Sequence, residues 1–428
     1  MDGRSCASDA PVFSMNVTAL MVGAEDATVD PPHGVVGCPD CGWIAALPRR
    51  SGHGVVHCLR CDAPLERTSG RSISAALACS LATLALLVPA NLSPLLRVSI
   101  LGVVNQSVIA SGVGGVWRQG WLIAAIVIGL EVVVVPFLRF GLLASVLAAI
   151  RVGVRGRWMG PAFRLAEALD EWAMVDVFLI GGVIAYGRIV RFLPVRIGAG
   201  GWCMIAAALL TMVTRASLER RAIWRAIAPD AAARPRDAVA CVACDMVVSA
   251  GTDRCPRCRR RVRRRRPFAT RRALALAVAG FVCYPAAYLY PMEISDRLGT
   301  AHPYTIMTGV FKLLDAGFWF FALVIFLASV VIPLLKLFAL AWFAISIHVA
   351  STARLRLKTH VCRLIREIGR WSHIDVFTVT VFLPLLHLEG YLGVTVGRAL
   401  PAFLAVVLLT MIASDIFDPR MLWAAAER

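Results

Sequence analysis

Charged residues are scarce in this 428-residue chain. Asp, Glu, Lys and Arg make up 17% of it, whereas soluble domains contain roughly a quarter. The mean hydropathy is +0.71. Because so little of the chain can be solvated by water, most of it must be solvated by lipid, and we interpret the protein as a polytopic membrane protein.

Lysine is almost absent, since Lys312, Lys336 and Lys358 are the only three. The formal net charge of +18 therefore depends on arginine, which clusters between the apolar stretches. This distribution fits the positive-inside rule of membrane proteins better than a DNA-binding patch. We expect the membrane as a partner and no nucleic acid.

Two kinds of motif are also missing. Residues 1–34 have neither the basic start nor the compact apolar core of a cleaved signal, and we expect a disordered N-terminal tail there. The chain has no G-x-x-x-x-G-K-[ST] stretch, so we expect no ATP hydrolysis and do not expect an enzyme.

Long apolar segments are what the chain does have. A bilayer is spanned by about 20 helical residues, and eight segments approach or exceed that length: 73–96, 121–150, 172–193, 198–213, 273–290, 318–347, 371–388 and 399–412. The second and the sixth carry about 30 residues and a proline near the middle, so they must tilt or project from the bilayer. An all-α membrane protein is predicted.

The arginine clusters also predict the orientation. They fall on one side of the membrane if the spans alternate, and that side should be cytosolic. Both termini would then be cytosolic, and the excursions at 97–120 and 292–317 would be periplasmic. These two excursions mix glycine with β-branched and polar residues, which suggests a small β-element in each.

The chain consists of two copies of one repeat unit. Cys58, Cys61 and Pro94 recur 197 residues later as Cys255, Cys258 and Pro291, and beyond the second span the offset becomes 199. We predict five parts: the tail (1–34), ribbon 1 (35–68), the four-span module 1 (69–228), ribbon 2 with a basic run (229–266) and the four-span module 2 (267–428). Because four spans are an even number, the two modules have the same orientation, as in a parallel repeat.

Each ribbon contains two CxxC pairs. Two such pairs place four thiolates on one ion, which is typical of a closed structural zinc site. We therefore predict two Zn²⁺ ions per chain, with rubredoxin-like iron, a redox CxxC and a DNA-binding ribbon as the alternatives. The predicted ligands are Cys38, Cys41, Cys58 and Cys61 in ribbon 1, and Cys241, Cys244, Cys255 and Cys258 in ribbon 2.

Ionisable residues inside the spans are costly and are usually partnered. Module 2 contains Lys336, Asp375 and Thr410, and module 1 has Arg139, Asp176 and Thr211 at the matching positions. We predict a polar network in which each cation pairs with the aspartate of its module. The alternative is that Asp375 completes a capping box with Ser372 while Lys336 snorkels. Whether the network relays protons or only holds the helices is left open.

The two units resemble the paraquat-inducible protein A family. The resemblance covers residues 35–425 and depends on the duplicated ribbons, "PANLSP" at 89–94 and "FDPRMLW" at 417–423. It implies tetraspanin-like four-helix modules in the bacterial inner membrane. Pro89, Asn91, Pro94 and Pro291, at the ends of the first and fifth spans, would then border a lipid path.

The resemblance also implies a function. Such a protein would load or extract phospholipid and exchange it with a periplasmic MCE-domain tunnel protein. The alternative is a membrane scaffold or stress sensor that acts through its ribbons. The charged residues predicted within the spans favour the transport function, because spans that only anchor the ribbons would not need charged residues inside the membrane.

Overall fold

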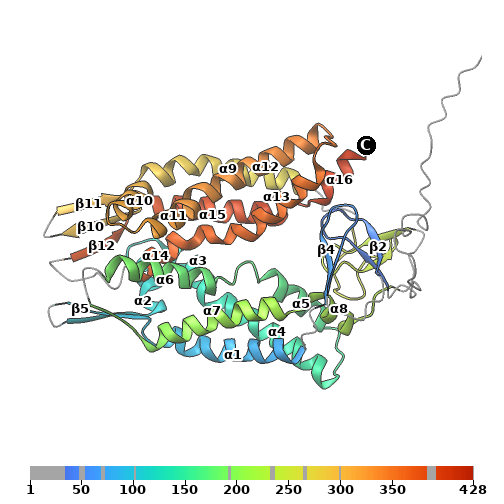
Figure 1. The fold of residues 1–428 in the computed structure, drawn as a ribbon, viewed down its shortest axis with the longest axis horizontal. Helices are drawn as coiled ribbons and strands as arrows, with labels where there is room; N and C mark the ends of the chain where they lie inside the picture. The colour runs from blue at the N-terminus through green and yellow to red at the C-terminus, as the bar shows by residue number, and fades with distance from the viewer. Residues whose placement is uncertain are drawn as a thin grey trace, which may run out of the picture.

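The computed structural model describes residues 34–47, 54–68, 73–100, 103–190, 194–231, 237–263, 268–297, 300–382 and 392–427. The predicted tail at 1–34 lies outside these residues except for its last position. Figure 1 shows an elongated bundle of helices with small β-sheets at one end and the two ribbons at the other.

The same order of helices occurs in both modules. Module 1 contains α1 (Ile73–Leu92), α2 (Ile109–Arg118), α3 (Leu122–Gly129), α4 (Val135–Val152), α5 (Met159–Ala168), α6 (Val175–Ile189), α7 (Ala199–Ser217) and α8 (Arg220–Ile227). Module 2 contains α9 (Ala269–Leu289), α10 (Ile306–Asp315), α11 (Trp319–Phe326), α12 (Ile332–His348), α13 (Leu355–Ile368), α14 (Ile374–Phe382), α15 (Ala399–Ile416) and α16 (Arg420–Ala426). The predicted tandem arrangement of a mainly helical membrane protein is confirmed.

Six helices in the described part of the chain are long and apolar enough to cross a membrane. They match six of the eight predicted spans. The third predicted span is the shorter helix α6, and the seventh contains α14, beyond which residues 383–391 are not described. Both shorter helices follow a break after an amphipathic helix, α5 or α13, because polar residues interrupt the apolar sequence there.

A wide helical turn occurs at the same place in both modules. The helix Leu122–Val152 contains the π-helical turn η2 (Leu130–Val134), and Trp319–His348 contains η3 (Leu327–Val331). Pro136 and Pro333 follow these turns directly. Proline has no N–H to donate and its ring collides with the preceding turn of an α-helix, so a wider turn relieves both problems.

The sheets at one end of the bundle join distant parts of each module. In module 1, β5 (Leu96–Ile100) pairs with both β6 (Val103–Ser107) and β7 (Val195–Ile197). In module 2, β10 (Glu293–Arg297) pairs with both β11 (Thr300–Tyr304) and β12 (Leu392–Val396). The predicted small β-elements are therefore present, and α2 and α10 follow them in the same two excursions.

The modules meet along α6 and α14, which lie side by side in the middle of the molecule. The rings of Phe178 and Phe377 contact each other edge to face there, with centroids 5.6 Å apart. Gly181 permits the close approach, since a Cβ at this position would lie 3.0 Å from the Phe377 Cβ.

Candidate metal centres and a buried polar network

The ribbons are built from short hairpins. Ribbon 1 contains β1 (Gly34–Gly37), β2 (Ile44–Leu47), β3 (Gly54–His57) and β4 (Pro64–Thr68), and ribbon 2 contains β8 (Ala238–Ala240) and β9 (Val247–Ser249). Each CxxC forms a turn closed by a backbone hydrogen bond to the carbonyl of its first cysteine, as from Asp62 N to Cys58 O at 2.8 Å. The residue after each CxxC has a left-handed conformation: Gly42, Asp62, Asp245 and Arg259.

These turns bring four thiols together in each ribbon. In ribbon 1 the Sγ atoms of Cys38 and Cys61 lie 3.5 Å apart, and those of Cys41 and Cys58 lie 3.6 Å apart. The four ligand atoms of each group lie within 4.8 Å of one another, and all eight cysteines are buried. A tetrahedron of sulfurs around one Zn²⁺ has edges of about 3.8 Å, so both groups fit a metal ion.

The second group has the same geometry. Cys241 and Cys258 lie 3.5 Å apart, as do Cys244 and Cys255, measured between Sγ atoms. The described cysteines include no disulfide. The structure therefore has two buried four-cysteine groups that could hold metal ions.

Each ribbon packs on the module of the other repeat unit. Ribbon 1 shares one hydrophobic cluster with Leu337, Phe343 and Trp423 of module 2. Ribbon 2 shares another with Leu143, Phe163 and Trp224 of module 1. In both cases the cysteines belong to the cluster.

Two polar contacts at equivalent positions follow the same crossed pattern. Arg363 of α13 pairs with Asp40 of ribbon 1 at 2.8 Å, and its counterpart Arg164 of α5 donates to the Cys258 carbonyl of ribbon 2 at 2.7 Å. Gly160 lets α5 approach ribbon 2, because a Cβ there would lie 1.9 Å from the Arg257 carbonyl oxygen. Equivalent positions in the two modules thus hold opposite ribbons.

A network of ion pairs lies between the helices of module 1. Arg139, in the middle of its long helix and 3% exposed, pairs with Asp170. Arg215 of α7 bridges Asp170 at 2.9 Å and Asp176 at 2.7 Å. The structure thus brings Arg139 and Asp176 into one network, but through two residues that the sequence analysis did not single out.

Two contacts extend this network into module 2. Arg370 reaches the Asp176 carboxylate at 3.5 Å. The His373 ring lies 3.3 Å from the Glu131 carboxylate, and both side chains are buried. Glu131 and His373 have no counterpart in the other module, where Ala328 and Met174 occupy the matching positions.

Module 2 lacks this arginine network at the matching positions. Lys336 is 1% exposed and donates to the Gly369 carbonyl at 2.8 Å. Asp375 lines a separate small cavity with Glu293 and Thr378. Gly369 and Ser414 stand where module 1 has Asp170 and Arg215, which explains why the two modules hold their cations differently.

The remaining predicted residues mostly bond to their own helices or close helix ends. Thr211 and Thr410 donate to the Ala207 and Val407 carbonyls within their helices. Asn91 donates to the Leu87 carbonyl one turn earlier in α1, and Pro89 lies inside the same helix. The carbonyls of Pro94 and Pro291 accept from the backbone N–H groups of Gly200 and Ala399 at the starts of α7 and α15.

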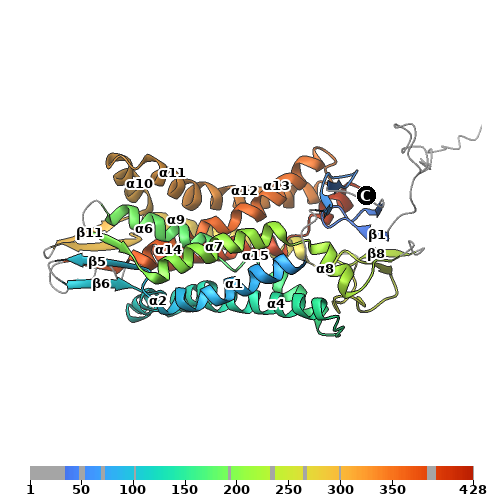
Figure 2. The ribbon, with the colours of Figure 1, turned by 60° about the horizontal axis from the view of Figure 1, so that its bottom comes forward.

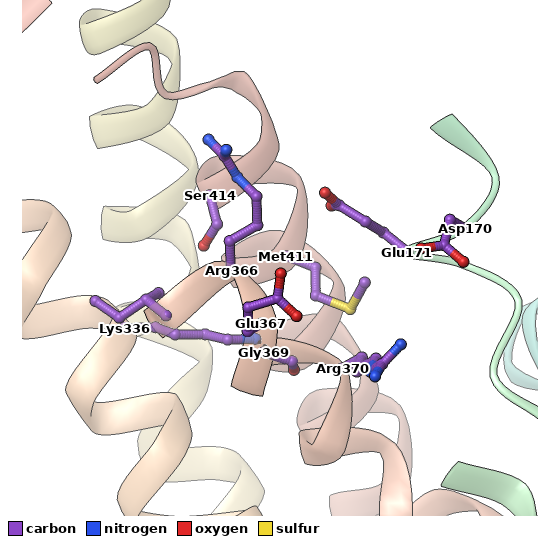
Figure 3. Close-up of a pocket in the computed structure, with 10 residues that line it drawn as sticks. Asp170, Glu171, Lys336, Arg366, Glu367, Gly369, Arg370, Met411 and Ser414 are labelled. Atoms are coloured by element: carbon purple, nitrogen blue, oxygen red, sulfur yellow. Dashed lines mark hydrogen bonds between the residues drawn. The ribbon is translucent and has the colours of Figure 1, made fainter. Parts of the chain in front are cut away.

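Two connected cavities lie beside the network. The Lys336 cavity, of about 90 Å³, is shown in Figure 3, with Lys336 reaching toward Gly369 and with Asp170 and Glu171 of module 1 on the other side. It shares Asp170, Glu171, Arg366 and Glu367 with the junction cavity, which has a volume of about 900 Å³. The junction cavity is polar and reaches Asp40 of ribbon 1 and Asp245 of ribbon 2.

Arginine residues near span ends could not be recognised from the sequence as members of a buried network. Arg215 and Arg370 both lie in clusters that fit the positive-inside rule, and such charges need no partner inside the protein. Asp170 lies just before the predicted third span, where a carboxylate is unremarkable. Only the packing of α4, α5 and α7 shows that these residues form one network.

The fold and the buried sites together define a class: a duplicated multi-pass membrane protein with two four-cysteine ribbons and a charged network between its helices. The sequence model of the family described as Paraquat-inducible protein A matches residues 73–228 and 270–427. The chain belongs to this family, as the resemblance predicted.

Curated relatives cover nearly the whole chain. The lipophilic envelope-spanning tunnel protein A of Escherichia coli K12 is 28% identical over 393 residues, which are 91% of each chain. The intermembrane transport protein PqiA of the same strain is 28% identical over 409 residues, covering 90% of this chain and 94% of the relative. A probable intermembrane transport protein of Haemophilus influenzae is 24% identical over 421 residues, covering 93% of this chain and 98% of the relative. No solved structure matches.

Proposed function

We propose that this protein moves phospholipid between the bacterial inner membrane and a periplasmic MCE-domain tunnel protein. The names of the relatives support a role in transport between membranes. Both termini and both ribbons would be cytosolic, and the sheets would be periplasmic. The two ribbons would each hold one structural Zn²⁺.

The charged network between the modules carries this proposal. Arg139, Asp170, Asp176 and Arg215 are buried or partly buried among apolar helices. Ionisable groups at such depth cost about 2.5–3.5 kcal/mol each on insertion scales and usually mark a pathway or a relay. A phospholipid headgroup passing through the protein would need polar groups at this depth.

An apolar cavity supplies the second requirement. It has a volume of about 100 Å³ and is lined by Leu95, Phe178 and Met204 of module 1 together with Val381 of α14 in module 2. Its position between the modules suits a passing acyl chain. Movement of α6 against α14 would widen it.

The crossed packing of the ribbons counts against the scaffold or sensor alternative. Each ribbon packs on helices of the other repeat unit's module, as the Asp40–Arg363 pair illustrates. A sensor needs a surface that its partner can reach, and the cysteine faces of both ribbons are buried. The ribbons are better suited to hold the two modules together.

The test is complementation of an envelope-lipid defect by Arg139→Ala and Asp176→Asn, which remove one cation and one anion of the network, with protein abundance in the membrane measured in parallel. Both variants should lose most function while keeping near-normal abundance, because the headgroup would lose its polar partners. Lys312→Ala is the matched control, since Lys312 is exposed on α10 next to Tyr304. Full complementation by both variants at normal abundance would contradict the proposal.

A further inference from the structure

A large apolar groove lies at the ribbon end of module 2, away from the sheets. It has a volume of about 840 Å³ and is bounded by the start of α9, the end of α12 and α16. Its walls include Leu274, Ala341, Ala344 and Ile345, and Arg271 and His348 lie at its rim. Cavities of about 300–1,000 Å³ are the usual size of ligand sites.

Module 1 provides a comparison within the same chain. The residues matching Ala344 and Arg271 are Leu147 and Ser74. Leu147 is fully buried in the cluster that packs against ribbon 2, and Ser74 is bonded to Arg151, which matches His348. At the equivalent position in module 1, Leu147 occupies the space and the Ser74–Arg151 hydrogen bond spans it, whereas module 2 has the groove there.

The chemistry of the groove matches one kind of occupant. Ile345 is 62% exposed and Leu274 is 39% exposed, so the walls offer exposed apolar surface to an acyl chain. Phe268, which is 64% exposed, is an aromatic residue of the kind enriched where acyl chains meet headgroups. The Arg271 guanidinium is exposed at the rim and complements a phosphate.

Two further features add to this match. The Thr270 hydroxyl oxygen is buried at the groove and has no hydrogen-bond partner among the described residues. The arginine-rich segment 259–266 leads directly into Phe268 in the sequence, and each cation near an anionic leaflet contributes about 1 kcal/mol.

We propose that this groove binds an anionic phospholipid of the leaflet on the ribbon side, with an acyl chain against Leu274 and Ile345 and the phosphate on Arg271. The site is separate from the proposed transport path between the modules. It can be occupied whether or not the protein transports lipid.

The test uses the full chain with a photoreactive amino acid at Ile345, reconstituted in bilayers of phosphatidylethanolamine and phosphatidylglycerol. Illumination should give an adduct with the mass of phosphatidylglycerol in excess of its share of the bilayer. An adduct with a peptide of this chain would show that protein covers the groove and would overturn the proposal. Labelling of the two lipids in proportion to their abundance would overturn it as well.

Two variants that copy module 1 sharpen the test. Ala344→Leu should abolish the excess of phosphatidylglycerol by filling the groove, and Arg271→Ser should lower it about fivefold, which corresponds to the loss of about 1 kcal/mol per cation. Ala85→Leu makes the same change at an exposed position of α1 in module 1, outside the groove, and should change nothing. If both Ala344→Leu and Arg271→Ser keep the wild-type excess, the groove is not the site. Arg271→Ser decides the matter alone if Ala344→Leu does not fold.

Discussion

Among single residues, Asp230 makes the densest set of charged contacts on the ribbon side. Its carboxylate is 2% exposed and lies 3.2 Å from Arg221, 2.9 Å from Arg225 and 2.9 Å from Arg257. Arg221 and Arg225 belong to α8, and Arg257 belongs to ribbon 2. Burial alone would raise the pKa of Asp230, but the guanidinium groups, Arg221 foremost, hold it below the usual aspartate value.

We expect Asp230→Asn to loosen ribbon 2 from module 1. Three guanidinium groups would lose their shared anion, and removing one partner of a buried ion pair costs roughly 3 kcal/mol or more. Hydrogen exchange of residues 237–263 should become faster while exchange in α9 and α15 stays unchanged. Asp253→Asn, at a carboxylate 79% exposed, is the control and should leave the exchange of ribbon 2 unchanged.

Acid should have the same effect on the wild-type protein. Because the folded pKa of Asp230 is depressed, its stabilising contribution is fully present above the unfolded value of about 3.9 and is lost as pH falls through the folded pKa. Ribbon 2 should therefore detach below about pH 4, and Asp230→Asn should lack this step. Proteolysis of ribbon 2 across that pH range, with an acid-tolerant protease, measures the difference.

Residue types and spacing predicted the eight cysteines as two groups, because a CxxC is a local motif whose geometry needs no knowledge of the fold. They also pointed to Arg139 and Asp176 as members of a network. They could not supply Arg215 or Arg370, since the partner of a buried aspartate depends on which helix packs beside it. Lys336 shows the same limit: the carbonyl that it contacts belongs to Gly369, which has no side chain to read.

At the scale of elements, each ribbon packs on the module of the other repeat unit. This arrangement leads to a prediction that would not follow if each ribbon packed on its own module. In Cys58→Ser, ribbon 1 should lose its metal, and the bound metal should fall from two ions per chain to one. Folding of such ribbons is coupled to the metal. Because ribbon 1 packs on module 2, hydrogen exchange should rise in α12, α13 and α16 and stay unchanged in α5.

The matched variant is Cys255→Ser in ribbon 2. It should also remove one ion, but faster exchange should appear in α4, α5 and α8 of module 1. Elemental analysis gives the metal and its amount in both variants. If each variant instead loosened the module that follows its ribbon in sequence, the crossed packing would be wrong.

The packing of each ribbon on the module of the other repeat unit could not be predicted from the sequence. The two ribbons have the same cysteine pattern and the two modules have the same apolar pattern, so either ribbon could cover either module. The break in the third span of each module was partly visible in the polar residues 169–172 and 369–373.

At the scale of the whole molecule, the ribbons and the sheets lie at opposite ends of the bundle (Figure 2). If the ribbons are cytosolic, a cysteine placed at His302 of β11 should react with an impermeant thiol reagent in intact cells. A cysteine placed at Arg263, just after ribbon 2, should react only after the inner membrane is opened. Both positions are exposed, so the opposite labelling pattern would mean that the orientation is inverted.

The contact between ribbon 1 and module 2 also sets an order of events during synthesis. Ribbon 1 emerges first from the ribosome, but its resting place includes Phe343 and Trp423, the latter about 360 residues later. At 5–20 residues per second, ribbon 1 must wait roughly 20–70 s for the helices that will cover it. During that interval the apolar face of ribbon 1 is accessible to chaperones, metal carriers and another nascent copy. A pause in translation or a truncation near the 3′ end of the coding sequence would therefore leave ribbon 1 uncovered.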